Sequence, residues 1–167
     1  MRELDRDLPD IQLDGPVDPG ASVGVVGAGR LGNAMVSALR ETGREVHGPV
    51  GRGVAPAGEI VLLCVPDAEI AAAAATVAGA GKLVGHTSGA TPLAALAPAV
   101  AAGAELFGLH PLQTFARPGA RLAGSGCAVA TDGHARFDRV EHLGVDRAKS
   151  TVREGRPRAP ISTPSVI

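Results

Sequence analysis

The sequence lacks tryptophan and tyrosine altogether and holds only three phenylalanines among its 167 residues. Aromatic side chains are the platforms on which single-stranded nucleic acids stack, so their scarcity argues against that kind of binding. The formal net charge of −1 supplies neither a basic field for nucleic acid nor the charge of an acidic tail. We therefore expect no nucleic-acid partner.

A secretory signal and a membrane span are also missing from the sequence. The first seven residues are mostly charged and have no apolar region after them. Two alanine-rich uncharged stretches, 70–81 and 90–104, are too short to cross a bilayer. These features predict a soluble cytoplasmic protein without a membrane partner.

Cysteine is scarce, and the histidines are scattered. Cys64 and Cys127 lie in apolar, strand-like runs, where a buried and inert thiol is expected. The histidines show no i, i+4 pair on a helix, and the two cysteines are far apart in the sequence. We expect no metal site.

Glycine is abundant, and three glycines follow a short apolar run, Val23 to Val26. In a dinucleotide-binding turn, Gly27 permits the sharp bend, Gly29 lets the backbone approach a pyrophosphate, and Gly32 allows close packing of helix on strand. The alternative is an ordinary strand–turn–helix. The surrounding pattern of strand and helix favours a cofactor site made by Gly27, Ala28, Gly29, Arg30, Leu31 and Gly32.

Short apolar runs alternate with helical segments along residues 21–130. Strands are expected at 23–26, 45–47, 59–65, 82–86, 105–109 and 126–130, and helices at 31–42, 68–78 and 92–96. Residues 48–58 hold too many glycines and prolines for a helix, so a loop is expected there. The alternation predicts an α/β, doubly wound, mainly parallel sheet of about six strands.

The two ends of the chain differ from this middle part. Residues 1–20 mix charges with prolines and are interpreted as a mobile leader. Residues 131–167 are rich in Arg, His and Asp and are predicted to form an atypical tail, largely disordered. Residues 21–130 then form a single dinucleotide-binding domain.

Polar or turn-forming residues follow four of the predicted strands. They are the glycine turn, Pro66-Asp67, Thr87-Ser88-Gly89 and His110-Pro111. The carboxyl ends of parallel strands meet at one edge of the sheet, where open α/β sheets bind their ligands. We therefore expect one site at this edge, with Asp67 also capping the helix that follows it.

Four motifs occur in order: Gly27-Ala-Gly-Arg-Leu-Gly32, Ile60-Val-Leu-Leu-Cys-Val-Pro-Asp67, His86-Thr-Ser-Gly-Ala90 and Leu109-His-Pro-Leu-Gln-Thr-Phe115. Together they resemble the N-terminal half of a family of oxidoreductases with a Rossmann-like domain followed by a helical domain of unknown function. The wider group includes pyrroline-carboxylate reductases, deazaflavin-dependent NADP reductases and prephenate dehydrogenases. The resemblance covers about residues 21–130 and implies a second, helical domain, whose pattern the tail does not show.

The choice of cofactor depends on the segment after the second strand. NAD sites usually carry an acid there, but residues 47–58 have none and hold Arg52 between two glycines. A guanidinium at this position favours a 2′-phosphate and therefore NADP, with NAD as the second option. A solvated loop arginine is the alternative. Arg30 could also reach a phosphate, or simply face solvent.

The remaining site residues lie at the other strand ends. Val65, Pro66 and Thr87 are expected to flank the cofactor. Prephenate dehydrogenases place a serine and a His-Pro histidine at comparable turns, so the resemblance implies catalysis by Ser88 and His110, with His110 exchanging a proton and Ser88 orienting. A structural histidine is the alternative. Gln113 and Thr114 could bind substrate, whereas His86 is interpreted as a structural histidine of the strand.

These observations predict an NADP-linked oxidoreductase domain acting on a small carbonyl, imine or alcohol. A non-catalytic dinucleotide-binding module, or a truncated inactive fragment, is the alternative. A methyl transferase would normally have an acid after the second strand, which is lacking here. A sheet domain without its helical half would expose apolar surface, so a homodimer is one expectation.

Overall fold

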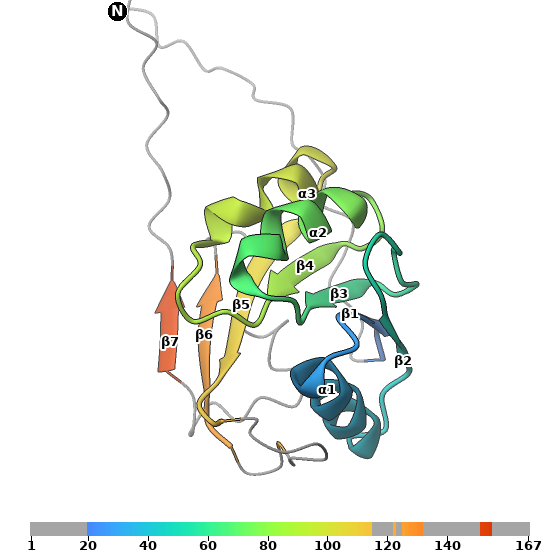
Figure 1. The fold of residues 1–167 in the computed structure, drawn as a ribbon, viewed down its shortest axis with the longest axis vertical. Helices are drawn as coiled ribbons and strands as arrows, with labels where there is room; N and C mark the ends of the chain where they lie inside the picture. Colours follow the sequence, from blue (N-terminus) through green and yellow to red (C-terminus); the bar gives the residue numbers. More distant parts are fainter. Residues whose placement is uncertain (1–19, 115–121, 123–124, 132–150, 155–167) are drawn as a thin grey trace, which may run out of the picture.

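Seven strands form one sheet, and helices cover both of its faces (Figure 1). The structure is a computed structural model and describes residues 20–114, 122, 125–131 and 151–154. The strands are β1 (Val23–Val26), β2 (Val46–Val50), β3 (Ile60–Leu63), β4 (Leu83–His86), β5 (Glu105–Pro111), β6 (Cys127–Thr131) and β7 (Thr151–Glu154). The helices are α1 (Arg30–Glu41), α2 (Ile70–Thr76) and α3 (Ala97–Ala101), with 3-10 turns η1 (Asp67–Glu69) and η2 (Leu93–Leu96).

The strand order β2-β1-β3-β4-β5-β6-β7 confirms the predicted α/β, doubly wound class. β1 to β5 are parallel, β6 runs antiparallel to β5, and β7 runs parallel to β6. The sheet has seven strands, where about six were expected. β2 and β3 lie on opposite sides of β1, so the winding reverses between β1 and β3. Ligands of open α/β sheets bind at such a switch point.

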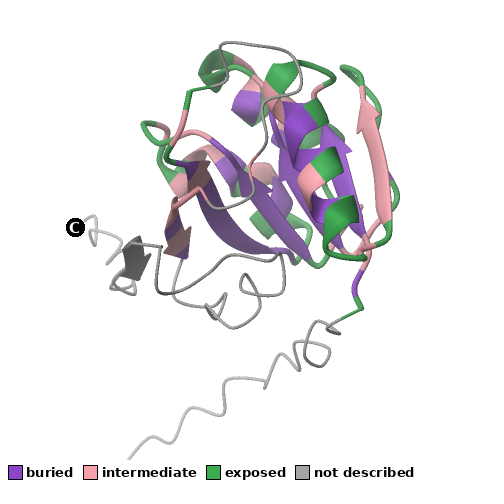
Figure 2. Ribbon diagram, turned by 90° about the horizontal axis from the view of Figure 1, so that it is seen from below, coloured by how far each residue is buried: buried purple, intermediate pink, exposed green. Residues whose placement is uncertain are grey.

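The two helical layers bury separate faces of the sheet. α1 contributes Met35, Val36 and Leu39 to one core, while α2 and η2 contribute Ile70, Ala74 and Leu96 to the other. The central strands β3 and β4 are buried along their whole length, as expected for parallel strands covered on both sides (Figure 2). Along the described ranges, no helix is both long enough and apolar enough to cross a membrane.

The second strand is longer than predicted, whereas the loop after it is confirmed. β2 continues through Gly48 and Pro49 to Val50, although these residues were expected to belong to the loop. Pro49 is tolerated because β2 is an edge strand, where the missing N–H costs little. Gly27 N–H donates to the carbonyl oxygen of Val50 at 2.8 Å, so the strand end is tied to the glycine turn. No helix separates β2 from β3.

The fifth strand also runs past its predicted end. His110 and Pro111 were expected in a turn, but both belong to β5. The prediction was wrong because β6 pairs with β5 in antiparallel register and extends it, with His110 opposite Ala128. β4 ends earlier, where His86 pairs with Gly108. His110 therefore still lies beyond the carboxyl end of β4.

Most of the two terminal regions lies outside the described residues. This holds for residues 1–19 and for most of the predicted tail, 131–167. Within that tail, the structure describes a strand at Thr151–Glu154 that pairs with β6. Apart from Thr131 in β6, the rest of the tail lies outside the described residues, so its predicted disorder stays a prediction.

Candidate functional site

Gly27 and Gly32 close the turn between β1 and α1. Gly27 has a φ of +104°, and a Cβ atom there would lie 2.2 Å from the carbonyl oxygen of Cys64. A Cβ atom at position 32 would lie 1.8 Å from the carbonyl oxygen of Gly27. Neither approach is sterically allowed, so both positions require glycine. The turn thus packs directly against the end of β3, at the switch point of the sheet.

Gly29 differs from the two other glycines because its surroundings are empty. A Cβ atom at this position would meet no heavy atom within 4 Å. α1 begins directly after it, with no side-chain cap and no acidic residue in its first turn. The amide of Asn33 donates to the carbonyl oxygens of Ala28 and Gly29 at 3.0 and 2.9 Å, which fixes the turn. The positive end of the helix dipole therefore meets solvent beside bare backbone, as anion binding requires.

The other predicted cofactor residues lie around this turn. Ala28 and Arg30 are exposed, and Leu31 is half-buried. Val65 approaches the turn closely, because a Cβ atom at Gly27 would lie 3.3 Å from Val65 Cγ1. Pro66 is exposed beside it. Val65 therefore lies against the glycine turn, at the ends of β1 and β3.

Asp67 does not cap the following helix as predicted. The chain enters a 3-10 turn, Asp67–Glu69, before α2 begins at Ile70, and neither turn nor helix has a side-chain cap. The carboxylate of Asp67 acts on His86 instead: burial lowers the pKa of His86, and the charge of Asp67 opposes this effect. Pro66 explains the difference, since its extended backbone delivers Asp67 into the first turn rather than to the capping position before it.

Arg52 is paired with an acid that the sequence analysis did not consider. Its guanidinium donates to the carboxylate of Glu69, which belongs to η1. The arginine side chain is 82% exposed and that of Glu69 30% exposed. The pair joins the loop after β2 to the segment after β3, so it spans the end of β1 at the glycine turn. Any phosphate bound by Arg52 competes with Glu69.

His110 is held by the end of β4. Its Nδ1 lies 3.0 Å from the carbonyl oxygen of Thr87. A carbonyl oxygen can only accept, so Nδ1 carries the proton and Nε2 is left to exchange one. The ring packs on Gly89, where a Cβ atom would lie 2.9 Å from Nε2. Thr87 itself is buried and donates from Oγ1 to the carbonyl oxygen of Leu63 at 3.2 Å.

Ser88 lies in the turn after β4, and its hydroxyl is hydrogen-bonded within that turn rather than to His110. Its hydroxyl donates to Thr91 Oγ1 at 3.0 Å and accepts from the N–H groups of Ala90 and Thr91 at 3.2 and 3.0 Å. These three bonds use the full capacity of a hydroxyl group. Ser88 therefore shapes the turn after β4, and it contacts a ligand only by exchanging one of these bonds.

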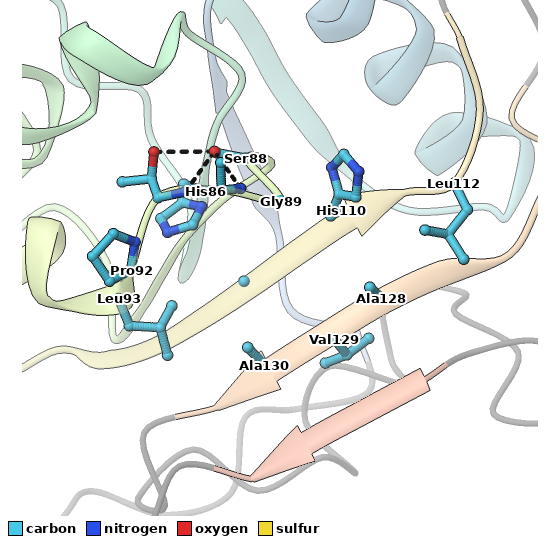
Figure 3. A pocket seen from close by; sticks show the side chains of 13 residues that line it. His86, Ser88, Gly89, Pro92, Leu93, His110, Leu112, Ala128, Val129 and Ala130 are labelled. Atoms are coloured by element: carbon cyan, nitrogen blue, oxygen red, sulfur yellow. Dashed lines mark hydrogen bonds between the residues drawn. The ribbon is translucent and has the colours of Figure 1, made fainter.

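A cavity of about 510 Å³ lies beside these two residues (Figure 3). His86 and His110 border it from the ends of β4 and β5, and Figure 3 shows β6 along its other side. The rest of the lining is small or apolar: Ser88, Gly89, Ala90, Thr91, Pro92, Leu93, Gly108, Leu112, Ala128, Val129 and Ala130. Gln113 and Thr114 do not belong to the lining. Gln113 accepts instead from the hydroxyl of Ser125.

His86, which the sequence analysis interpreted as a structural histidine, also borders this cavity. It is 1% exposed, and neither Nδ1 nor Nε2 has a hydrogen-bond partner. Burial lowers the pKa of His86, opposed by the charge of Asp67 and by the nearby backbone of Pro92, His86 and Ser88. Each unpartnered polar atom costs about 1–3 kcal/mol. The available signal was a lone polar residue in an apolar strand, on the same face as Val84.

Cys64 is buried, as predicted, whereas Cys127 is only half-buried. Burial raises the pKa of Cys64 to about 12, against a smaller opposite effect of its hydrogen bond with Thr87. Burial also raises the pKa of Cys127. Both thiols therefore stay protonated and poorly reactive. Among the described residues, no three His, Cys, Asp or Glu side chains are grouped as a metal site requires.

Comparisons with known proteins agree with this architecture. A family model described as a Rossmann-like domain matches residues 49–111. No curated protein matches the sequence.

Many solved structures share the fold, and three of them are compared with the chain as follows. An imine reductase from Streptomyces aurantiacus is 22% identical, with a TM-score of 0.59 over 81% of this chain and 56% of its own. Arogenate dehydrogenase from Synechocystis is 19% identical, with a TM-score of 0.56 over 81% and 60%. A Plasmodium falciparum pyrroline carboxylate reductase with NADP bound is 12% identical, with a TM-score of 0.58 over 86% and 60%. The chain spans a little over half the length of these proteins, and its fold is Rossmann-like.

Proposed function

We propose that the chain is the dinucleotide-binding domain of an oxidoreductase that transfers hydride between NADP(H) and a small carbonyl, imine or alcohol substrate. One observation carries the proposal. Gly27 and Gly32 are sterically closed against backbone, whereas Gly29 between them is open on its outer side. Packing explains the two closed glycines, but it does not explain the open one. A diphosphate lying on Gly29 at the start of α1 does.

The residues around the turn fit such a ligand. The backbone of Gly29 and the first turn of α1 would hold the diphosphate, with no acid in that turn to repel it. Arg52 would meet a 2′-phosphate after leaving Glu69. When bound, the nicotinamide supplies or accepts the hydride. NAD remains the second option, because the Arg52–Glu69 pair already neutralises the guanidinium.

The proton that accompanies hydride transfer is assigned to His110. Thr87 holds Nδ1, so Nε2 donates a proton to a developing alkoxide when the ring is protonated and accepts one from an alcohol when it is neutral. Ser88 keeps the turn after β4 in shape, and that turn carries both Thr87 and Gly89 against the His110 ring. Two strand spacings, about 10 Å, separate β1 from β4, so the glycine turn and this group share one edge.

A non-catalytic dinucleotide-binding module is the second candidate. It is favoured by the hydroxyl of Ser88, whose hydrogen bonds all stay within its own turn. Such a module would bind the dinucleotide and leave carbonyl compounds unreduced.

Thermal unfolding with NADPH, NADH and S-adenosylmethionine tests the proposal. A ligand at one hundred times its dissociation constant stabilises the native state by about 2.7 kcal/mol. For a chain of this size that is a rise in Tm of roughly 5–10 °C. We expect the largest rise with NADPH. Binding of NADPH without turnover of any carbonyl compound supports the module, and a rise with S-adenosylmethionine alone contradicts both candidates.

A further inference from the structure

The described residues around the cavity beside β5 give it an uncharged lining. Among the described residues that line it, none is Lys, Arg, Asp or Glu. Asp67 is not part of this lining, but its charge acts on the His86 ring. A carboxylate or phosphate ligand would find no cation here and would meet the field of that acid. A cationic ligand would find no acid in the wall itself. The wall therefore fits an uncharged molecule.

His86 supplies the polar contact that such a molecule needs. The ring is almost fully buried, borders the cavity, and leaves both nitrogens without a protein partner (Figure 3). A neutral imidazole offers one N–H donor and one acceptor nitrogen. A histidine that served packing alone would be better replaced by an apolar ring, because buried polar groups are normally paired. The unpartnered nitrogens point to a bond completed by a ligand.

Gly108 gives a ligand room to approach that ring. It pairs with His86 across β4 and β5, and a Cβ atom there would lie 3.8 Å from His86 Cε1 and 3.6 Å from both Leu93 Cδ2 and Ala130 Cβ. These are ordinary contacts, so packing does not demand a glycine at this position. Its absent side chain keeps open the space between His86 and the apolar wall.

We propose that this cavity binds a small, uncharged, largely apolar ketone or aldehyde, or the alcohol derived from it, with His86 hydrogen-bonded to its oxygen. The inference names the substrate class of the oxidoreductase and rests on the proposed function for the ligand's role as substrate. His86 is then a binding residue, and His110 remains the group that exchanges the proton. Leu93 and Ala130 contact the apolar part of the ligand.

Three probes that share one aromatic ring test the inference by NMR on the full chain with labelled histidines. They are acetophenone, benzoate and ethylbenzene, added without nucleotide. Acetophenone is expected to shift the ring signals of His86 and to bind at least tenfold more tightly than benzoate. Ethylbenzene is expected to bind more weakly than acetophenone and to leave the nitrogen signals of His86 in place. Tighter binding of benzoate, or unmoved His86 signals with acetophenone, overturns the inference.

Two variants and a control complete the experiment. His86→Phe keeps a ring but removes both nitrogens, so the affinity for acetophenone should fall about tenfold, to the level of ethylbenzene, a loss of about 1.4 kcal/mol. Gly108→Ala should weaken both ligands and leave Tm unchanged. His47→Phe, on the edge strand β2, is the matched control. It should change neither the affinity for acetophenone nor the affinity for ethylbenzene. Acetophenone binding that is unchanged in His86→Phe contradicts the inference.

The probe titrations contain no nucleotide, so failure of the inference can be distinguished from failure of the proposed function. NADPH binding without acetophenone binding removes the substrate class and leaves the proposed function standing. Acetophenone binding without NADPH binding leaves the cavity as a ligand site and removes the proposed function.

Discussion

The two ends of the proposed site differ in whether backbone or side chains form them. At the end of β1 the site is formed by backbone: two glycines pack against carbonyl oxygens, and a third has no neighbour on its outer side. At the ends of β4 and β5 the site is formed by side chains. His110 is held by the carbonyl oxygen of Thr87, and His86, whose ring nitrogens have no hydrogen-bond partner, borders the cavity. The first region suits a ligand that every member of a cofactor class shares. The second suits a ligand that differs from one enzyme to the next.

The largest expected effect lies at the side-chain end. His110→Asn keeps a donor that can reach the carbonyl oxygen of Thr87 but removes the proton site at Nε2. Loss of a general acid or base lowers kcat by about 10²- to 10⁴-fold. Affinity for NADPH should stay within twofold, because the histidine lies away from the glycine turn. Steady-state kinetics with His47→Asn as the control checks this, and an unchanged kcat refutes the role of His110.

At the backbone end, Gly32→Ala should strongly destabilise the protein. Alanine is the better helix former by about 1 kcal/mol, so this change in α1 would normally stabilise. The new Cβ atom would instead lie 1.8 Å from the carbonyl oxygen of Gly27. We expect a net loss of about 3 kcal/mol in the free energy of unfolding, measured by urea denaturation. Unchanged or raised stability would show that the turn is less tightly closed than described.

The orphaned ring of His86 predicts a dependence of stability on pH. Burial holds the pKa of His86 below its ordinary value of 6.5, so the unfolded chain takes up the proton first as pH falls. The wild-type protein should lose stability below about pH 6.5, by at most about 1.4 kcal/mol per pH unit, until the folded-state pKa is reached.

His86→Phe cannot take up this proton, so its stability relative to wild type should rise steadily between pH 7 and pH 5. Urea unfolding of both proteins across this range measures the difference. A constant difference would mean that His86 titrates alike in the folded and unfolded chains.

The smallest expected effect concerns the choice of cofactor. Glu69→Gln frees Arg52, and an exposed ion pair is worth at most about 1 kcal/mol, so NADPH should bind up to about fivefold more tightly. NADH, which lacks the 2′-phosphate, should bind as before. The companion variant Arg52→Asp should shift preference from NADPH toward NADH. If the ratio of the dissociation constants for NADPH and NADH is the same in wild type and both variants, Arg52 does not contact the cofactor.

The contrast between the backbone end and the side-chain end of the site also explains which features the sequence could predict. The glycine turn was predictable because its geometry depends on three residues within one short segment. The loop between β2 and β3 was predictable for the same reason, since its prolines and glycines exclude a helix locally. The alternation of strands and helices gave the doubly wound sheet, and comparison with known structures supports it.

The side-chain end depended on contacts between distant segments. His110 was placed in a turn because the antiparallel partner β6, which extends β5, cannot be inferred from the residues around His110. The pairing of Arg52 with Glu69 joins segments 17 residues apart and was missed for that reason. His86 was interpreted as structural because its missing partners become visible only when β4, β5 and η2 are assembled.

The most direct test of the account is a calorimetric titration of wild type and Gly29→Val with NADPH, together with the Tm of each free protein. The new side chain meets no atom of the chain within 4 Å at its Cβ, so the free variant should match wild type in Tm. It would occupy the space assigned to the diphosphate, so NADPH affinity should fall at least tenfold. Equal affinity for NADPH in the two folded proteins would contradict the claim that the open glycine receives a dinucleotide.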